Sequence, residues 1–385
     1  MPWQEHSPVD LRYSFIVDWQ LGIVSVCELC EAYGISRKTG YKWIARFTAG
    51  GAPALADQSR RPHSSPHASR TAVIDAVCAA HRRHPLWGAR KLGLWLGRRY
   101  PTQAWPSRVT LQAILQRAGL QPARRSRPPR WRSTRVHTPA TGPNRVWTVD
   151  FKGDFRLGDG TRCYPLTVRD LATRYTLTCR GLAAPARERT QRWVDAAFAE
   201  FGLPDCIRSD NGEPFAGPGL GGLSRLNVRW LRLGIRIEHI EPGCPAQNGA
   251  HEQFHRVLKA HTTRPPALTA RAQQQRFDRF CQLYNHERPH DGLGGDVPAD
   301  HYHPSRRPWP QRVPEVDYPA HWERRTELPN GRSRWHGDAM LLSRALAGEA
   351  VGLEEIDDGL WTVHFATTAL AYWCARQRRL RPIGH

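Results

Sequence analysis

The chain has 385 residues, which is too long for one ordinary domain and predicts two to four. Its 56 lysines and arginines exceed its 35 acidic residues, and the net charge of +21 favours a polyanionic partner such as nucleic acid. The first residues lack a secretory-signal pattern and no apolar run is long enough to span a bilayer, so we expect a cytoplasmic protein with no membrane partner. The nine cysteines are scattered and odd in number, which argues against a disulfide framework.

Residues 9–51 are predicted to form a helix-turn-helix head. Apolar side chains recur at helical spacing at Val26, Leu29, Cys30 and Tyr33. Gly34 ends this helix, and Ser36 is a good cap for a second helix from Arg37 to Phe47. An ordinary helical hairpin is the alternative, which the basic charge disfavours. The residues expected to face a DNA groove or its phosphates are Arg37, Lys38, Thr39, Tyr41 and Lys42.

Two linkers are predicted on either side of a second helical unit. Residues 52–70 are rich in proline, serine and arginine, and residues 71–120 carry three apolar stripes at helical spacing, which predict another helix-turn-helix-like unit that binds DNA. Residues 121–142 combine arginines with prolines and little apolar material, which predicts an extended linker. We expect this linker to follow a phosphate backbone through arginines that include Arg124, Arg125 and Arg127.

Residues 143–302 alternate strand and helix patterns, which predicts a mixed sheet flanked by helices. The expected strands are Arg145–Phe155, Arg162–Asp170, Tyr175–Leu182, Cys206–Ser209 and Arg236–Ile240. The expected helices are Thr190–Phe201, Leu220–Leu233, Gln247–Thr262 and Ala270–Asn285.

The C-terminal part is predicted to be a β domain behind a further linker. Residues 303–325 form the Pro/Arg linker, and residues 326–385 include two strand patterns around the turn Asp357-Asp358-Gly359. We expect a small β-barrel there that binds DNA. The whole chain is thus expected to be a multidomain α+β protein with N-terminal helix-turn-helix units, an α/β mixed-sheet core and a C-terminal barrel.

Three acids stand out because each has a distinctive local sequence. Asp150 interrupts the apolar run Val146–Phe151, Asp210 follows the strand Cys206–Ser209, and Glu252 begins the helix after Gln247-Asn248-Gly249. An aspartate inside a buried strand is costly, although backbone donors at a strand end are the ordinary explanation. Together the three acids look like ligands of one site.

Carboxylates without a Cys/His ligand cluster specify a hard, oxygen-loving ion, Mg²⁺ or Mn²⁺. Two such ions would suit an in-line phosphoryl substitution. On the expected helix Gln247–Thr262 the apolar stripe is Phe254, Val257, Leu258 and His261. The opposite face, expected to hold DNA phosphates beside Glu252, carries His255, Arg256 and Lys259. A solvated charged face is the alternative for that helix taken alone.

The motifs resemble the retroviral-integrase superfamily, and more closely a bacterial insertion-sequence transposase with an integrase core. The resemblance is carried by V-W-T-V-D-F at 146–151, S-D-N-G at 209–212, P-x-x-P-A-Q-N-G-x-x-E-x-x-H-R at 242–256 and Tyr284-Asn285-His286-Glu287-Arg288-Pro289-His290. Residues 34–43 resemble the family's helix-turn-helix head, so the similarity runs from about residue 10 to the end.

The resemblance implies an RNase H-like core with the catalytic, metal-binding triad Asp150, Asp210 and Glu252. Asp150 would contact both metals, and the other two acids one each. The gap from Asp210 to Glu252 exceeds that of the retroviral members, an excess that the Gly-rich stretch Ala216–Leu223 accounts for. Glu241 competes for the third role, whereas Asp170 is interpreted as a turn or loop partner.

The resemblance further implies hydrolysis at the ends of a DNA element and attack of the freed 3′-hydroxyl on target DNA, by a homo-multimer on double-stranded DNA in the bacterial cytoplasm, near the nucleoid. Two alternatives stay open. One is a catalytically silent, sequence-specific DNA-binding protein derived from a transposase. The other is a metal-dependent nuclease without strand transfer.

Overall fold

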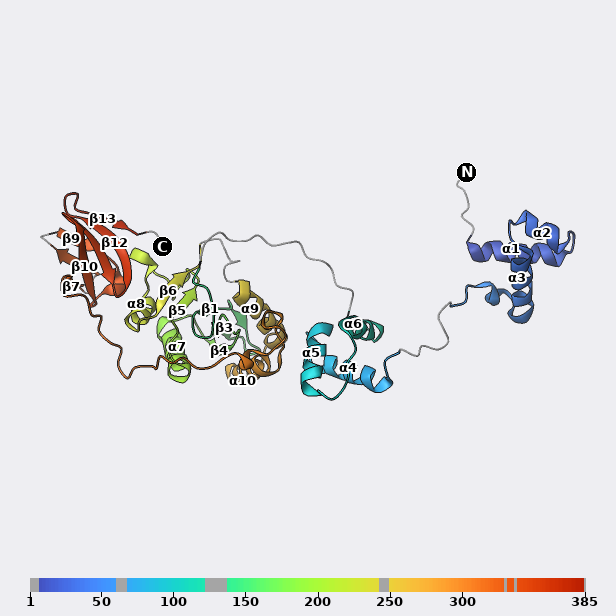
Figure 1. The fold of residues 1–385 in the computed structure, drawn as a ribbon, viewed down its shortest axis with the longest axis horizontal. Helices are drawn as coiled ribbons and strands as arrows, with labels where there is room; N and C mark the ends of the chain where they lie inside the picture. Colours follow the sequence, from blue (N-terminus) through green and yellow to red (C-terminus); the bar gives the residue numbers. More distant parts are fainter. Residues whose placement is uncertain are drawn as a thin grey trace. The chain divides into compact units, whose positions relative to one another are not determined.

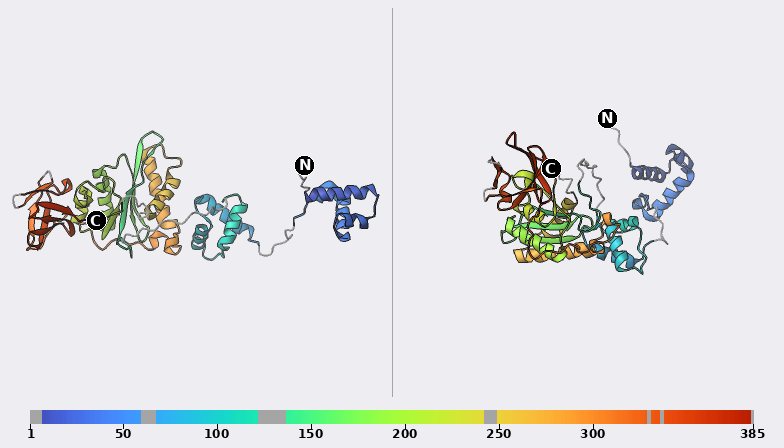
Figure 2. Two further views of the ribbon diagram at one scale, coloured as in Figure 1. Left: turned by 90° about the horizontal axis from the view of Figure 1, so that it is seen from above. Right: turned by 60° about the vertical axis from the view of Figure 1, so that its left-hand side comes forward.

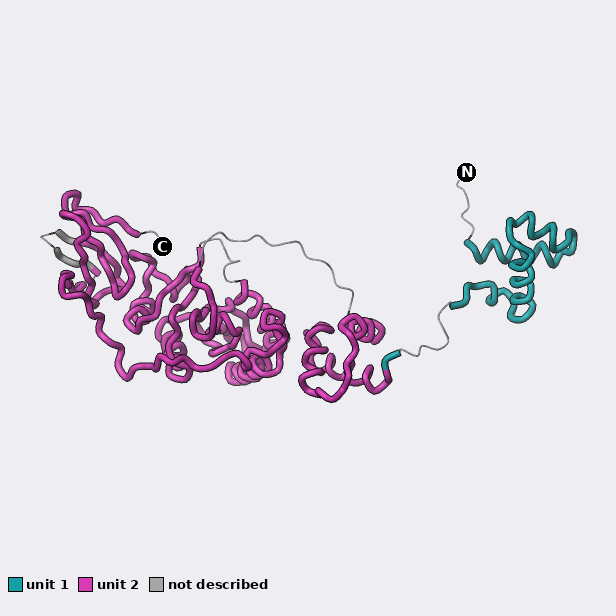
Figure 3. Tube along the Cα trace, in the orientation of Figure 1, with its two compact units in different colours: residues 1–69 teal, residues 70–385 magenta. Residues whose placement is uncertain are grey.

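The computed structural model describes residues 7–59, 68–121, 137–241, 249–328, 331–335 and 338–383. These fall into two compact units, residues 1–69 and residues 70–385, which Figure 3 draws in different colours. None of the described helices is long and apolar enough to cross a membrane. The predicted linker arginines Arg124, Arg125 and Arg127 lie outside the described residues, as does the stretch 242–248 that leads to Glu252.

The first unit is a three-helix head with α1 (Pro8–Leu21), α2 (Val26–Ala32) and α3 (Arg37–Gly50). The Ser36 hydroxyl caps α3 by accepting from the backbone N–H of Thr39, as the sequence predicts. Gly40 is required where α3 meets the other helices, since a Cβ there would lie 2.4 Å from the Cys30 sulfur. Cys30 is therefore a packing residue of this small core, together with Phe15 and Trp43.

Three further helices, α4 (Thr71–Arg83), α5 (Ala89–Arg99) and α6 (Arg108–Arg117), form the second helical group at the predicted place. Their apolar faces share one core that includes Val77, Leu92 and Leu115. The group contacts the segment that follows α10: Arg98 forms a two-pronged ion pair with Asp300, and the Lys91 ammonium donates to the Pro289 carbonyl at 2.7 Å.

The centre of the second unit is a mixed sheet with helices on both faces (Figure 1). Its strands follow the order β2-β3-β1-β5-β6, with β4 paired to β3. The bounds are β1 Trp147–Phe151, β2 Phe155–Arg156, β3 Arg162–Asp170, β4 Thr176–Leu182, β5 Cys206–Ser209 and β6 Arg236–His239. β1 runs antiparallel to β3 and parallel to β5, and β5 runs parallel to β6.

Side chains along β1 point alternately to the two faces of the sheet, and a different pair of helices covers each face. Trp147 and Val149 point into a core shared with α7 (Arg187–Phe201) and α8 (Arg225–Arg232). The opposite face is covered by α9 (Gly249–Thr262) and α10 (Ala270–Gln282), which bury Phe254 and Phe277 in a second core. The two helix pairs lie on opposite sides of the green strands in the left view of Figure 2.

Two elements of the core differ from the prediction. The expected strand Arg145–Phe155 is divided into β1 and β2, because Gly153 has a φ of +76° between them. The expected helix Leu220–Leu233 is shortened to α8, preceded by the 3₁₀ turn Leu220–Gly222, because Gly221 and Gly222 each have a φ of +65°. Positive φ interrupts a right-handed helix, so glycine decides both differences.

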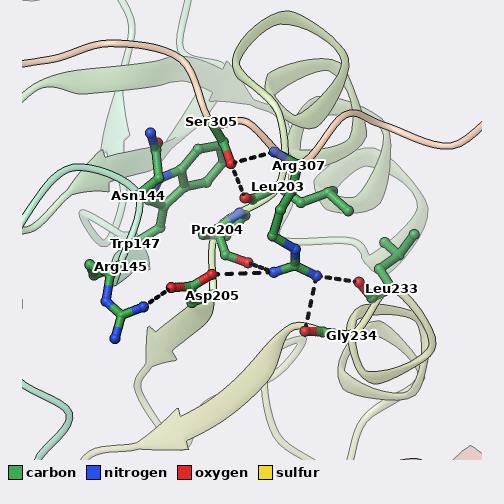
Figure 4. A network of polar contacts seen from close by, with 10 residues as sticks. All are labelled: Asn144, Arg145, Trp147, Leu203, Pro204, Asp205, Leu233, Gly234, Ser305 and Arg307. Carbon is green, nitrogen blue, oxygen red and sulfur yellow. Dashed lines mark hydrogen bonds and ion pairs between the residues drawn. The ribbon is translucent and has the colours of Figure 1, made fainter.

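The segment predicted as a linker after residue 302 packs tightly on the core at its beginning. Arg307 donates to the carbonyls of Pro204 at 2.6 Å, Leu233 at 2.8 Å and Gly234 at 3.1 Å, and its guanidinium lies 3.6 Å from the Asp205 carboxylate (Figure 4). Asp205 also pairs with Arg145 at 2.5 Å. Asp205 therefore joins two arginines at the point where β5 begins.

The C-terminal strands form an open sheet in the order β13-β12-β11-β10-β7, beside the two-stranded pair β8-β9. Their bounds are β7 Glu323–Thr326, β8 Arg332–Trp335, β9 Asp338–Leu341, β10 Ala350–Asp357, β11 Leu360–Phe365, β12 Thr368–Cys374 and β13 Arg379–Pro382. The predicted barrel is not confirmed by the described residues, in which β13 and β7 lie at the two ends of the sheet order.

Candidate active site

Asp150 and Asp210 lie on neighbouring parallel strands at matching positions. β1 and β5 pair through Trp147 with Ile207 and Thr148 with Arg208. Two residues further along each strand are Asp150 and Asp210, so the pairing brings the two carboxylates to the same edge of the sheet. Asp210 directly follows the last residue of β5, where its carboxylate accepts from the backbone N–H of Gly212 at 3.3 Å.

Glu252 reaches this edge from the first turn of α9. The helix is anchored beside Asp150, because the Nδ1 atom of His255 lies 3.8 Å from the Asp150 carboxylate. Glu252 itself is exposed, on the side of α9 that faces away from the core. The structure therefore brings Asp150 and Asp210 to one edge of the sheet, and it places Glu252 near enough for its charge to act on Asp150.

The charges of Asp210 and Glu252 both act on Asp150. The pKa of Asp150 is raised to about 7, first by burial and then by the charge of Asp210, with a smaller contribution from Glu252. The backbone of Phe151 and the charge of Lys152 lower it, but not enough to offset the rise.

This donor set fits a divalent cation. Holding like charges at one edge of a sheet is costly, and a bound cation would offset that cost. Carboxylate oxygens are the donors that Mg²⁺ and Mn²⁺ prefer. Asp170, by contrast, is fully buried and accepts from the backbone N–H groups of Asn144 and Thr173 at 2.7 Å, so its role is structural as predicted.

His255 is buried rather than exposed, although it lines a cavity together with Glu252. The sequence placed it on the exposed cationic face of α9, but its exposed fraction is only 5%, and burial lowers its pKa to about 3. His251, one helical turn earlier, is also buried, with a pKa well below its usual range. Asp150, His251 and His255 place one potential ligand atom each within 4.8 Å of one another, so a histidine cluster does stand beside the acids.

Two threonines connect these histidines to the sheet. The ring nitrogens of His251 lie 2.8 Å from the Thr148 hydroxyl and 2.6 Å from the Thr167 hydroxyl. His255 shares the second hydroxyl through Nε2, at 2.8 Å. The sequence contains a signal for the pair His251 and His255, because residues four apart lie on one face of a helix. The apolar stripe of that helix, however, indicated a different buried face.

A cavity of about 440 Å³ opens beside Glu252 on the outer side of α9. Basic side chains line it at Lys152, Arg256, Lys259 and Arg264. Arg256 and Lys259 are exposed, as predicted for this face. Lys152 and Arg264 were not predicted as DNA contacts, and Lys152 could have been, because it shares its face of the strand with Asp150.

In the head, the predicted DNA-contacting residues of α3 are mostly accessible. Arg37, Lys38, Tyr41 and Lys42 are exposed. Thr39 is half-buried and its hydroxyl lies 2.9 Å from that of Ser36, so it takes part in capping the helix.

The segment Tyr284–His290, part of the sequence resemblance, is structural. The Asn285 side chain accepts from the backbone N–H of Thr176 and donates to its carbonyl, both at 2.9 Å. The Tyr284 hydroxyl accepts from Arg169 at 3.1 Å, and Arg169 also donates to the carbonyl of Ala250 at 3.1 Å. These bonds tie the start of α9 to β3 and β4, and so help to hold Glu252 in place.

Comparison with known families agrees with this geometry. An integrase core domain matches residues 140–245 and again residues 233–298, and a homeodomain-like domain matches residues 9–56 and 39–115. A curated relative, the "Insertion element IS476 uncharacterized 39.2 kDa protein" of Xanthomonas euvesicatoria, is 31% identical over 159 residues, which cover 41% of this chain and 44% of that protein. The chain thus matches less than half the length of this relative.

Solved structures of viral proteins are distantly similar. The HTLV-2 integrase catalytic core domain in complex with magnesium matches with a TM-score of 0.34 at 14% identity, over 42% of this chain and 99% of that one. A chain of the simian T-cell lymphotropic virus intasome in complex with the PP2A regulatory subunit B56 gamma matches with a TM-score of 0.35 at 16% identity, over 80% and 99%. Likeness at such TM-scores carries no argument about this fold. On the family matches, the chain contains an integrase-type core that follows homeodomain-like domains, and part of it is similar to an insertion-element protein.

Proposed function

We propose that this chain is a DNA transposase that cuts the ends of its element and joins the freed 3′-hydroxyl to target DNA, with Asp150, Asp210 and Glu252 as its catalytic, metal-binding acids. The observation that carries the proposal is the matched position of Asp150 and Asp210 on β1 and β5, with α9 anchored beside Asp150. With this arrangement, the three acids, which are far apart in the sequence, would act on the same phosphodiester.

The three carboxylates would hold two divalent ions, Mg²⁺ or Mn²⁺. When bound, such ions activate an attacking oxygen and stabilise a leaving oxygen in an in-line phosphoryl substitution. The chain itself needs no covalent nucleophile for this chemistry. Its residues position the ions and the DNA strand, which is the main contribution of a protein to phosphoryl transfer.

The basic cavity beside Glu252 supports a role in binding the DNA strand. Lys152, Arg256, Lys259 and Arg264 line it, and each can neutralise a phosphate. Because Glu252 lines the same cavity, a backbone that follows these cations would pass the acids. A basic groove beside an acid cluster suits an enzyme that holds a polyanion while it acts on one phosphate.

The helical parts would select the DNA site. The exposed residues Arg37, Lys38, Tyr41 and Lys42 at the start of α3 suit contact with a groove and its phosphates. The linker arginines 124, 125 and 127 would add phosphate contacts. Two element ends have to meet before joining, so the active form would be a homo-multimer on double-stranded DNA.

The test uses the purified full chain, Mg²⁺ or Mn²⁺, and a duplex that carries the element's end. Joined products support the proposal. Cutting without joining would identify a nuclease, and binding alone a catalytically silent DNA-binding protein; either result overturns the proposal. The Asp150→Asn variant should bind the duplex as well as the unchanged protein and neither cut nor join. If that variant stays active, the assignment of the site is wrong.

A further inference from the structure

We infer that His255 is a fourth protein ligand of the catalytic cations, bound through Nδ1, and that this nitrogen gives the site a preference for Mn²⁺ over Mg²⁺. The inference rests on the proposed function, because it deepens the metal site formed by Asp150, Asp210 and Glu252. It starts from the position of His255 Nδ1, 3.8 Å from the Asp150 carboxylate.

The distance suits two ligands of one ion better than a hydrogen bond. A nitrogen–oxygen hydrogen bond spans about 2.7–3.2 Å, so a separation of 3.8 Å is too long for one. Two donor atoms that each lie about 2.1 Å from the same ion are separated by about 3–4 Å, depending on the angle between them. The carboxylate of Asp150 and the imidazole of His255 are therefore spaced to bind a cation together.

The hydrogen bonds of Thr167 leave a lone pair on this nitrogen. The Thr167 hydroxyl has one hydrogen and donates it to the backbone carbonyl of Asp150, at 3.1 Å. We therefore assign the hydrogen of each histidine to Nε2, so that both donate to the Thr167 oxygen. With the hydrogen of His255 on Nε2, its Nδ1 carries the lone pair that a metal ligand needs, and this lone pair lies on the side of Asp150.

His251 does not compete for this role. The sequence His251-Glu252-Gln253-Phe254-His255 has the H-E-x-x-H spacing in which two histidines bind one zinc ion. Here, however, both nitrogens of His251 are engaged by hydroxyls, of Thr148 and Thr167. His251 thus fixes the position of α9 on the sheet, while His255 keeps one nitrogen for a ligand.

An imidazole ligand changes which cation fits. Mg²⁺ binds oxygen donors almost exclusively, whereas imidazole suits transition-metal ions, and Mn²⁺ accepts both donor types. A site of three carboxylates and one imidazole is therefore better matched to Mn²⁺. Replacing His255 by Asn should weaken Mn²⁺ binding on the order of tenfold and Mg²⁺ binding by less.

Pulsed electron paramagnetic resonance of Mn²⁺ bound to the full chain, without DNA, tests the inference directly. The protein is produced once with ordinary histidine and once with ¹⁵N-histidine, so that an imidazole ligand is identified without any mutation. We expect a histidine nitrogen coupled directly to Mn²⁺. The coupling should disappear in His255→Asn and persist in His239→Asn, a matched control because His239 is an imidazole on the other side of the acids, with Nδ1 3.3 Å from the Asp210 carbonyl oxygen.

The outcomes separate this inference from the proposed function. Mn²⁺ that binds in an Asp150-dependent way without a histidine coupling, or with one that survives in His255→Asn, overturns the inference and leaves the carboxylate site standing. If Mn²⁺ binds equally well to Asp150→Asn, or does not bind at all, the inference and the metal site of the proposed function both fail.

Discussion

An aspartate flanks each end of strand β5, and the two aspartates have opposite electrostatic surroundings. Asp205, just before the strand, pairs with Arg145 and lies 3.6 Å from Arg307 (Figure 4). Asp210, just after it, lies beside another acid, Asp150, and raises its pKa. The first end is neutralised and stable as it stands. The second end keeps like charges together, which is costly unless a cation binds, and such an arrangement marks a functional site.

The largest effect should come from exchanging the acid at the catalytic end. Asp210→Asn should reduce cutting and joining by on the order of 10³-fold or more, because an amide is a poor ligand for a divalent ion. Its metal-free stability should not fall, since a repulsive charge is removed. Gel assays of cutting and urea unfolding measure the two effects.

Asp205→Asn at the other end of β5 is the matched control. It should lower stability and leave the activity per folded molecule unchanged, because it weakens ion pairs far from the reaction. The comparison would fail if both variants lost activity to the same extent.

The second largest effect should be a loss of stability when Arg307, which neutralises Asp205, is replaced. Arg307→Ala removes three hydrogen bonds to backbone carbonyls, and we expect a loss of about 2–3 kcal/mol in the free energy of unfolding. Urea denaturation measures it, with the exposed neighbour Arg306→Ala as the control. Equal stabilities of the two variants would show that the network in Figure 4 does not hold this end of β5.

At the catalytic end, stability without metal should depend on pH. The folded protein holds a proton on Asp150 up to a pKa of about 7, whereas an unfolded aspartate loses it near about 4. This contribution is fully present below the lower value and is lost as the pH rises through the upper one. Between pH 5 and pH 7 the loss should be about 2 kcal/mol.

The pH effect is measured in the presence of a chelator as the difference between the unchanged protein and Asp150→Asn. Taking the difference removes the contributions of the buried histidines. A difference that stays constant across this pH range would contradict the elevated pKa of Asp150.

The smallest effect should come from the basic cavity. Lys259→Ala should weaken DNA binding several-fold for all sequences alike and reduce the slope of log affinity against log salt by about one. Binding titrations at several salt concentrations measure both, and Arg192→Ala, exposed on α7 across the sheet, is the control. If the slope of log affinity against log salt were unchanged in Lys259→Ala, the DNA backbone would not bind in the basic cavity.

Local sequence singles out the three acids but not the side chains that surround them. Asp150, Asp210 and Glu252 could be found because each lies next to a strand or turn that its neighbours specify. The burial of His255 could not, because it depends on the hydroxyls of Thr148 and Thr167, which the strands supply from distant positions. The apolar residues of a helix indicate which of its faces is buried. They do not indicate that an imidazole outside that face is buried as well, because such burial requires hydrogen bonds to groups on other elements.

The fold was likewise predictable where local patterns decide it. The bounds of β3 and β5 match the prediction at both ends, because alternation and flanking turns define them. Closure of the C-terminal strands into a barrel could not be predicted, since it depends on whether two edge strands pair, and β13 and β7 do not. The expected helix Leu220–Leu233 is shortened to α8 because Gly221 and Gly222 have positive φ. The residue type alone does not reveal that a glycine adopts this conformation.

The most direct test of the central claim is the affinity for Mn²⁺, measured by calorimetry on the unchanged protein and on Asp150→Asn, Asp210→Asn, Glu252→Gln and Glu241→Gln. Binding should weaken at least tenfold in the first three variants and stay the same in Glu241→Gln. If Glu252→Gln bound Mn²⁺ normally while Glu241→Gln did not, the third acid would be misassigned. If none of the four changed the affinity, the three acids would not form a cation site.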